Sequence, residues 1–215
     1  MTTPTATCPN CGAAIRFEWS HAVQTTCPFC HSVLVRGDVD LKTVGKVGDF
    51  PPTSSPLQIG TTGSFRHRSF AVVGRIVYEY DRGSWNNWHV RLDDGASAWL
   101  SDARGEYAFA VEQPAGTTAP SRQQLQIGSN AVWEHRIYKL MAVTAARYRA
   151  VEGELPFTTW DRQEATLADF DANDGHIATV DYRGEPPAVY LGEWTAFDDL
   201  HLAQLREIDG WPLPR

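Results

Sequence analysis

From residue 57 onward, the chain alternates short apolar runs with turn residues, which is typical of an antiparallel β protein. The runs are rich in β-branched and aromatic residues, and turn sequences such as DRGS and DANDG separate them. The predicted strands are 70–80, 88–93, 98–100, 107–112, 137–149, 177–182 and 189–194. Only residues 195–210 have helical spacing, so one short C-terminal helix is predicted there.

One pattern occurs twice in this region. Leu-Gln-Ile-Gly opens both 57–78 and 125–148, at an offset of 68 residues, and a polar turn, a short strand and a longer apolar strand follow each time. The recurrence predicts an internal repeat with halves at about 57–120 and 125–200. His67 and His135 occupy equivalent positions, so one turn geometry is expected to account for both.

All four cysteines of the chain lie in its first 30 residues, in the pattern C-x2-C-x15-C-x2-C. This spacing is typical of a four-cysteine zinc site, because two tight turns each present a pair of sulfurs and a short hairpin between them brings the pairs together. The runs IRFEW and SVLVRG predict the strands of such a ribbon. The predicted metal ligands are Cys8, Cys11, Cys27 and Cys30.

The expected metal is structural, at one ion per chain. Four thiolates leave no open coordination position for an activated water, and a ribbon of this size needs the metal in order to fold. Iron bound as in rubredoxin uses the same four ligands and stays open beside zinc. A redox pair of Cys-x-x-Cys motifs is disfavoured because no βαβ pattern surrounds the cysteines, and His31 is a further candidate ligand.

A glycine-containing stretch followed by a Pro/Ser cluster separates the ribbon from the rest of the chain. The predicted organisation is a zinc ribbon at 1–40, a linker at 41–56 and a β domain at 57–215. The predicted fold is therefore mainly β: a small ribbon, then a two-part antiparallel domain, barrel- or sandwich-like, with a short C-terminal helix.

Charge narrows the classes of function. The net charge is −7, and from residue 151 onward 14 acidic residues face 4 arginines. The chain has no Lys/Arg block, so it lacks the electrostatic footprint of most nucleic-acid-binding proteins. It also has no secretory leader and no apolar run long enough to span a membrane, so a cytoplasmic location is expected.

The order of several short motifs is more specific than any one of them. LQIGTTG, FAVVGRIVYEY, WNNWHVRLDDGASAWL, VEGELPF, ATVDY and VYLGEW follow one another over about residues 57–200. In sequence and order they resemble the bacterial family known as domain of unknown function 4178. The resemblance implies a β-rich domain, often preceded by a zinc ribbon, with no established activity. It also implies an association with membrane-stress proteins of the phage-shock type and with polyamine-synthase-like enzymes.

No catalytic signature is present. The sequence has no H-E-x-x-H, G-x-S-x-G, Walker loop or G-x-G-x-x-G, and no two acidic residues are fixed at a catalytic separation, so no catalytic residue is predicted. Three residues are candidates for interaction with a partner. Trp85 and Trp88 bracket a turn-like Asn-Asn, and exposed aromatics are typical of interfaces. Glu154 lies in the family-like motif GELP.

The leading hypothesis is a non-enzymatic zinc-ribbon adaptor or scaffold that binds another protein, in a bacterial membrane-stress or polyamine-linked system. One alternative is a nucleic-acid-binding zinc ribbon protein, although Arg16 and Arg36 are the only positive residues in the first 40. The other is an enzyme or small-ligand-binding β domain, which requires a pocket that gathers side chains from both repeats.

Overall fold

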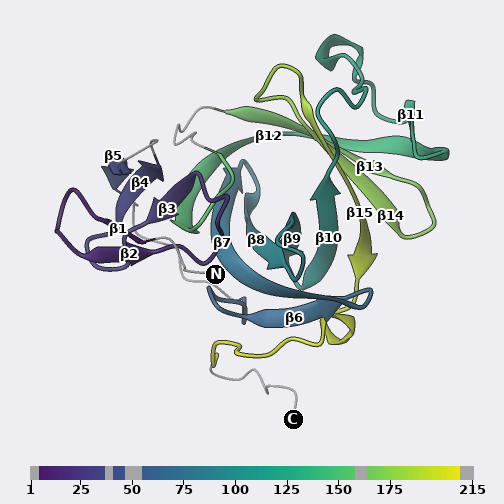
Figure 1. The fold of residues 1–215 in the computed structure, drawn as a ribbon. Helices are drawn as coiled ribbons and strands as arrows, with labels where there is room; N and C mark the ends of the chain where they lie inside the picture. The colour runs from purple at the N-terminus through teal and green to yellow at the C-terminus, as the bar shows by residue number, and fades with distance from the viewer. Residues whose placement is uncertain (1–4, 37–40, 47–54, 158–163, 209–215) are drawn as a thin grey trace.

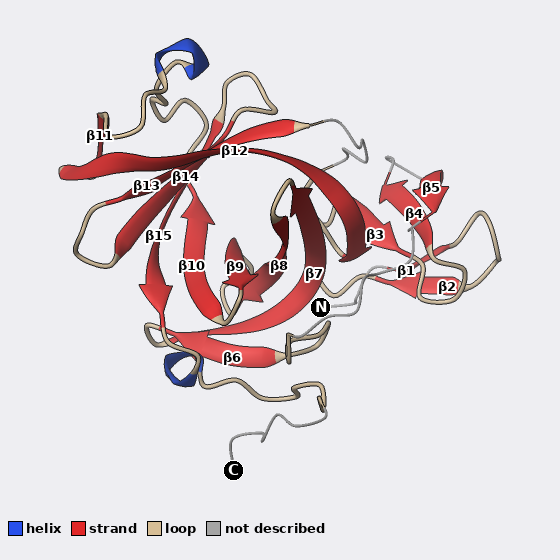
Figure 2. Cartoon of the chain, turned by 180° about the vertical axis from the view of Figure 1, so that it is seen from behind, coloured by secondary structure: helices blue, strands red, loops and turns tan. Residues whose placement is uncertain are grey.

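The computed structural model describes residues 5–36, 41–46, 55–157 and 164–208, and strands make up most of this part (Figures 1 and 2). The ribbon strands are β1 (Thr5–Thr7), β2 (Ala14–Arg16), β3 (Gln24–Thr26), β4 (Ser32–Arg36) and β5 (Leu41–Lys46). The first repeat holds β6 (Thr62–Phe65), β7 (Arg68–Tyr80), β8 (Gly83–Leu92), β9 (Ser97–Ala103) and β10 (Glu106–Glu112). The second holds β11 (Asn130–Trp133), β12 (Arg136–Gly153), β13 (Ala165–Asp171), β14 (His176–Asp181) and β15 (Ala188–Thr195).

The N-terminal part forms two small sheets, one of β1 and β2 and one of β3, β4 and β5. Residues 41–46, which we expected to begin the linker, instead form β5 and pair with β4. The run IRFEW contributes only its first residues to β2, and Phe17 and Trp19 beyond it are buried. The ribbon is thus larger than its cysteine spacing indicated.

The main sheet is antiparallel and closes on itself. Its ten strands run in the order β11-β12-β13-β14-β15-β10-β9-β8-β7-β6, and β12 also pairs with β7. Eight of them, β7 to β10 and β12 to β15, therefore form a continuous hydrogen-bonded ring, which Figure 1 shows nearly end-on. Closure leaves these eight strands without a free edge along their paired lengths.

The predicted repeat is present down to individual hydrogen bonds. Gly60 N–H donates to Val72 O at 2.9 Å, and 68 residues later Gly128 N–H donates to Leu140 O at 2.8 Å. The two glycines have φ of +90° and +89°, a backbone conformation that favours glycine. β6 and β11 start at this same offset, as do β7 and β12.

One turn geometry accounts for both repeat histidines, as expected. The two-residue turns Arg66-His67 and Glu134-His135 have positive φ at all four positions, between +48° and +65°. This is the conformation of a type I′ turn, whose twist matches that of a two-stranded hairpin. The histidines therefore lie at hairpin tips.

The two repeats meet through equivalent residues. Glu79 of β7 pairs with Arg147 of β12, and these positions differ by 68. Beyond β12 the offset grows to 80: Gly74 pairs with His89, while its equivalent Ala142 pairs with Asp169 (169 − 89 = 80). The extra 12 residues lie between β12 and β13, where the first repeat has only a two-residue turn. Two similar halves are thus joined about an approximate two-fold axis, and one carries an insertion.

Each repeat has its own core, and the two cores use equivalent positions. The first centres on Leu57, Phe70, Val72 and Trp88. The second includes Tyr138 and Leu140, which are equivalent to Phe70 and Val72. A third cluster joins the repeats to the ribbon and contains Val33, Ile76, Tyr78, Tyr148 and Leu155.

The predicted C-terminal helix is wrong. In the described part of 195–210 there is only a 3-10 turn, η2 (Asp198–Leu200). Leu200 is fully buried in the first core, and Ala203 then exchanges backbone hydrogen bonds with Thr62. Tertiary partners satisfy these backbone groups in place of helical ones. Across the described residues, no helix is long and apolar enough to cross a membrane.

Candidate functional site

The four cysteines converge, as their spacing predicted. Their sulfur atoms all lie within 4.8 Å of one another, with Cys8 Sγ 3.7 Å from Cys30 Sγ and Cys11 Sγ 3.6 Å from Cys27 Sγ. A tetrahedral ion with metal–sulfur bonds of 2.3 Å requires sulfurs about 3.8 Å apart. The four side chains therefore fit one tetrahedral metal ion.

Two matching turns present the sulfurs. Gly12 N–H donates to Cys8 O at 2.9 Å, and His31 N–H donates to Cys27 O at 3.0 Å. Gly12 and His31 both have positive φ, +76° and +57°. His31 thus occupies the turn position that follows the second cysteine of its pair, and its ring is not part of the metal-binding cluster.

Polar groups surround one of the cysteines. Ser32 Oγ lies 3.2 Å from Cys30 Sγ, and the Asn10 amide donates to Ser32 Oγ at 3.0 Å. Hydrogen bonds from Ser32 and Asn10 lower the pKa of Cys30 to about 5. A thiol in this setting ionises readily, and the thiolate is the form that binds a metal.

Glu154 fixes the ribbon to the closed sheet. Its side chain is buried, and its carboxylate accepts hydrogen bonds from the backbone N–H groups of Glu18 at 2.6 Å and Trp19 at 2.7 Å. Burial raises the pKa of Glu154 to about 6, while the two N–H groups act in the opposite direction. The predicted interaction residue therefore lies in an interface within the chain.

Backbone bonds extend this interface. Val23 and Gln24 N–H both donate to Leu155 O, at 3.0 and 3.1 Å, and Leu155 N–H returns a bond to Gln24 O at 2.9 Å. The Trp19 indole donates to Gly95 O at 2.9 Å. The ribbon is consequently held at several points rather than attached only through the chain.

His89 lies beneath this interface and is fully buried. One ring nitrogen is 2.8 Å from Glu154 O and the other 2.7 Å from Ser97 Oγ. Trp19 packs edge-on against the ring at 4.8 Å. Burial lowers the pKa of His89 to about 4, so the ring is neutral at pH 7 and acts as a polar joint between sheet and insertion.

The two tryptophans proposed as surface contacts lie elsewhere. Trp88 is fully buried in the first core, with Arg75 4.8 Å above its ring, and therefore offers no surface to a partner. Trp85 is half-buried and stacks on Tyr78 at 4.8 Å. It faces a cavity between the repeats.

That cavity measures about 510 Å³ and is lined by residues from all eight strands of the ring. On each strand its residues alternate with residues of the repeat cores: Trp99, Ser101 and Ala103 of β9 face it, while Ala98 and Leu100 face the first core. Small residues such as Ala108 and Ala110 leave the space that the aromatic walls enclose.

The cavity has one aromatic and one acidic side. Tyr78, Trp85, Trp99, Phe157 and Tyr190 are among its aromatic residues. Its charged residues are Glu106, Asp169, Asp171, Asp181 and Arg183. Burial raises the pKa of Asp181 to about 6 and also raises the pKa of Asp169.

Arg183 is the cation among these lining residues. Its Nε donates to Asp181 at 2.8 and 3.0 Å, and one of its terminal nitrogens donates to the Tyr78 hydroxyl at 3.1 Å. Its guanidinium also lies 4.4 Å above the Tyr148 ring. Arg183 is thus fully engaged with the wall.

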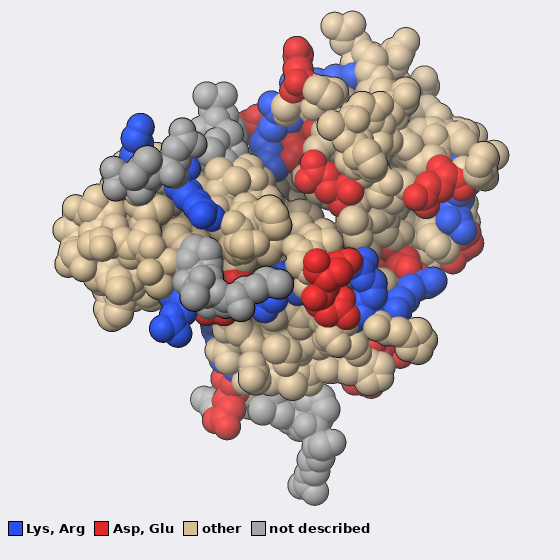
Figure 3. All heavy atoms as spheres, viewed as in Figure 1, with Lys and Arg blue, Asp and Glu red and all other residues tan. Residues whose placement is uncertain are grey.

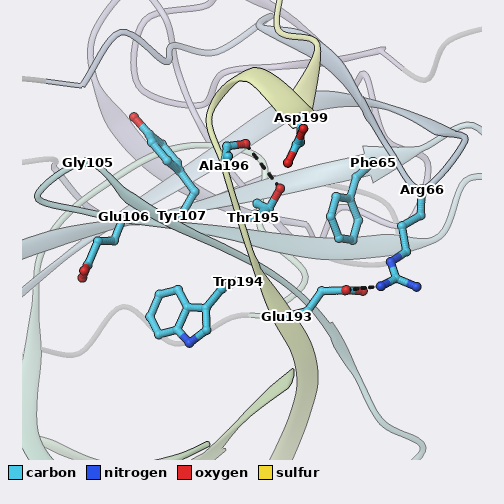
Figure 4. Close-up of a pocket in the computed structure, with 10 residues that line it drawn as sticks. All are labelled: Phe65, Arg66, Gly105, Glu106, Tyr107, Glu193, Trp194, Thr195, Ala196 and Asp199. Carbon is cyan, nitrogen blue, oxygen red and sulfur yellow. Dashed lines mark hydrogen bonds and ion pairs between the residues drawn. The ribbon is translucent and has the colours of Figure 1, made fainter. Parts of the chain in front are cut away.

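A second, open cleft of about 620 Å³ lies beside the cavity, between the β6–β7 turn and β15 (Figure 4). An ion pair between Arg66 and Glu193 crosses it. Glu106 and Trp194 line both this cleft and the cavity. The cleft lacks the aromatic enclosure of the cavity, which we take as the stronger candidate binding site.

Sequence reasoning found the cysteines but missed the cavity. Asp169, Asp181 and Arg183 were taken as part of an acidic stretch, and β13 was not predicted. The alternation of Leu167, Asp169 and Asp171 with buried residues was the available signal. No local pattern indicates that these residues face Trp85 across a closed sheet.

Comparison with known proteins gives one match. A family model described as Domain of unknown function (DUF4178) matches residues 58–197, which is 140 of the 215 residues and coincides with the closed sheet. No curated protein and no solved structure matches the chain.

Proposed function

Since the chain belongs to the family described as domain of unknown function 4178, whose description assigns no activity, we propose a function from the site: the closed sheet binds a small molecule in its central cavity, and the ribbon is a structural zinc module. The observation that carries this is the enclosure of about 510 Å³ by aromatic side chains with a few converging polar groups. Ligand sites commonly have this size and composition.

The rim gives access to the cavity. Met141 and Trp194 line it, yet they are 55% and 49% exposed. The deeper walls consist of buried residues such as Trp99 and Ala108. A site with exposed aromatic and thioether groups at its mouth and buried rings behind them suits a ligand that enters from solvent.

Zinc is the metal we assign to the four thiolates. It accepts a closed tetrahedral sulfur site without redox chemistry, which suits a module that only has to hold its fold. The ribbon contributes Val33 to the cluster that also contains Tyr78 and Trp99. Its role in this proposal is to support that wall of the cavity.

The test is binding of small probes, followed by the indole N–H signals of the eight tryptophans in NMR spectra. We would titrate indole, phenol, n-butanol, n-butylammonium and n-butyrate. Saturable shifts at Trp85, Trp99 and Trp194, with Trp88 and Trp133 unmoved, are expected for at least one probe. Ala110→Phe, which fills the cavity, should abolish them, whereas Ala145→Phe on the outer face of β12 should not. If none of the five probes binds, the proposal is wrong.

A second candidate is the adaptor function, favoured by one surface feature. Val132 and Ile137 pair across the β11–β12 hairpin and are 64% and 61% exposed, next to Ile127 at 61%. The equivalent positions in the first repeat hold Ser64 and Ser69. Exposed apolar residues that only one repeat carries are typical of a protein contact.

In this second proposal the hairpin, rather than Trp85 or Trp88, contacts a partner protein, in the membrane-stress or polyamine-linked setting that the family resemblance suggests. Val132→Ser combined with Ile137→Ser transfers the residues of the first repeat to the second. The double variant should lose a partner that the tagged parent protein captures from its native cells, with no change in melting temperature. Equal capture by both proteins would reject the hairpin as the contact.

A further inference from the structure

The charges that line the cavity do not balance. Four carboxylates, Glu106, Asp169, Asp171 and Asp181, face the single guanidinium of Arg183. Asp181 is paired with Arg183 through several hydrogen bonds. Figure 3 shows acidic side chains gathered beside a hollow near the middle of this face of the molecule. A second anion would meet repulsion in such a site, whereas a cation would offset the excess charge.

Asp169 is the carboxylate with the least local compensation. The one hydrogen bond that it makes is from the Thr179 hydroxyl, at 2.8 Å, and no arginine, lysine or histidine of the described residues forms an ion pair with it. Asp171, by comparison, receives the backbone N–H of Asn173 at 2.6 Å and the Trp194 indole at 3.3 Å. A carboxylate among aromatic walls without a cation is unfavourable unless something else supplies the charge.

The internal repeat shows what the equivalent place holds in the first half. Asp169 corresponds to His89, and Thr179 to Trp99. In the first half the ribbon covers this place, because Trp19 packs on His89 and the Glu154 carbonyl accepts its hydrogen bond. In the second half no segment of the described chain covers Asp169 in this way, and the equivalent face opens into the cavity.

The opposite wall is suited to an organic cation. Tyr78 and Trp85 stack at 4.8 Å with an interplanar angle of 12°, and both line the cavity. Trp194 lies at the rim beside Asp171. The faces of such rings attract an ammonium group through their quadrupole, and more strongly where water is excluded.

We propose that the central cavity binds a small organic ammonium ion, with Asp169 accepting hydrogen bonds from the ammonium group and the Tyr78–Trp85 stack contacting the alkyl chain. This rests on the proposed function above and adds the chemical class of the ligand. A second amino group at the far end of the chain would fall near Asp171 and Glu106, so a diamine is expected to bind more tightly than a monoamine.

The test is isothermal titration of the metal-loaded full chain with n-butylammonium, 1,4-diaminobutane, n-butanol and n-butyrate at pH 7.5. The expected order of affinity is diamine, then monoamine, then alcohol, with no detectable butyrate binding. Asp169→Asn should weaken amine binding at least tenfold and leave n-butanol binding within twofold. Asp81→Asn, an equal charge change on an exposed turn, should behave as the parent protein.

Two outcomes overturn the proposal and differ from failure of the proposed function. Butyrate or butanol binding as tightly as the amines would leave a small-molecule cavity but reject the cationic ligand. Amine binding that Asp169→Asn and Asp81→Asn weaken equally would show a general effect of surface charge rather than a site. Absence of binding by any probe would reject the cavity itself.

Discussion

Replacing Glu154 with Gln is expected to loosen the ribbon from the closed sheet. The carboxylate holds two backbone N–H groups, of Glu18 and Trp19, at 2.6 and 2.7 Å. Glutamine keeps one acceptor oxygen but turns an NH₂ group toward the other N–H. One charge-assisted bond is lost with a buried donor left unsatisfied, and the other becomes a neutral bond.

The magnitude follows from these two changes. A hydrogen bond to a charged group contributes about 1.5–3 kcal/mol and a neutral bond about 1 kcal/mol. The net loss for the docked state is therefore about 2–4 kcal/mol, which corresponds to a roughly 30- to 900-fold larger equilibrium constant for undocking. Relief of the burial that raises the pKa of Glu154 places the expected value toward the lower end.

Amide hydrogen exchange measures this directly. Val23 and Gln24 donate to Leu155 O across the interface, so their protection factors report docking. Glu152→Gln is the matched control, because Glu152 is exposed on the same strand and its one ion pair, with Arg75, is long at 4.0 Å. Protection of Val23 and Gln24 within threefold of the parent protein in Glu154→Gln would refute the assigned role of the carboxylate.

Three further predictions concern the metal, the strand joint and pH. Cys27→Ser, or chelation of the parent protein, should reduce bound zinc from one ion per chain to none by mass spectrometry and abolish protection of Val23 and Gln24; retained protection would show that the ribbon folds without metal. Gly74→Ala should destabilise the fold by about 1–3 kcal/mol or more in urea, since its Cβ would lie 2.0 Å from Glu154 O; Gly184→Ala, with 3.3 Å to Pro186 O, is the control, and equal midpoints would reject the close approach. Affinity for n-butylammonium should rise between pH 5 and 7, because Asp181 ionises at a pKa of about 6 and the pKa of Asp169 is also raised, and the carboxylate is the form that binds a cation; a flat profile would exclude both groups. The other titratable groups facing this site are Glu106, Asp171, Arg183, Tyr78, Tyr80 and Tyr190.

The sequence was informative wherever the cause of structure is local. Cysteine spacing fixes which sulfurs can meet, since each pair is held by one tight turn, and the metal cluster follows it. The LQIG recurrence likewise marks a glycine with positive φ in both halves. These features depend on a few neighbouring residues, which is why a pattern of letters predicted them.

The errors arose where distant segments decide the outcome. The periodicity of residues 195–208 favours a helix, yet Leu200 is taken by the first core and Ala203 by Thr62. Trp88 resembled an exposed aromatic because of the adjacent Asn-Asn, but β8 begins at Gly83 and turns its ring inward. β13 was missed because Asp169 and Asp171 interrupt its apolar pattern, and only the closed sheet makes an acidic inward face tolerable.

The insertion between β12 and β13 connects the two unusual features of the molecule. Glu154 and Leu155, at its start, bind the ribbon. Two residues later Phe157 lines the cavity, parallel to the Tyr148 ring within 1° and to the Trp99 ring within 16°. A two-residue turn occupies this place in the first repeat and could do neither. The segment that breaks the symmetry of the repeat therefore gives the ribbon its docking site and the cavity one of its walls, so the state of the metal site is structurally coupled to the shape of the cavity.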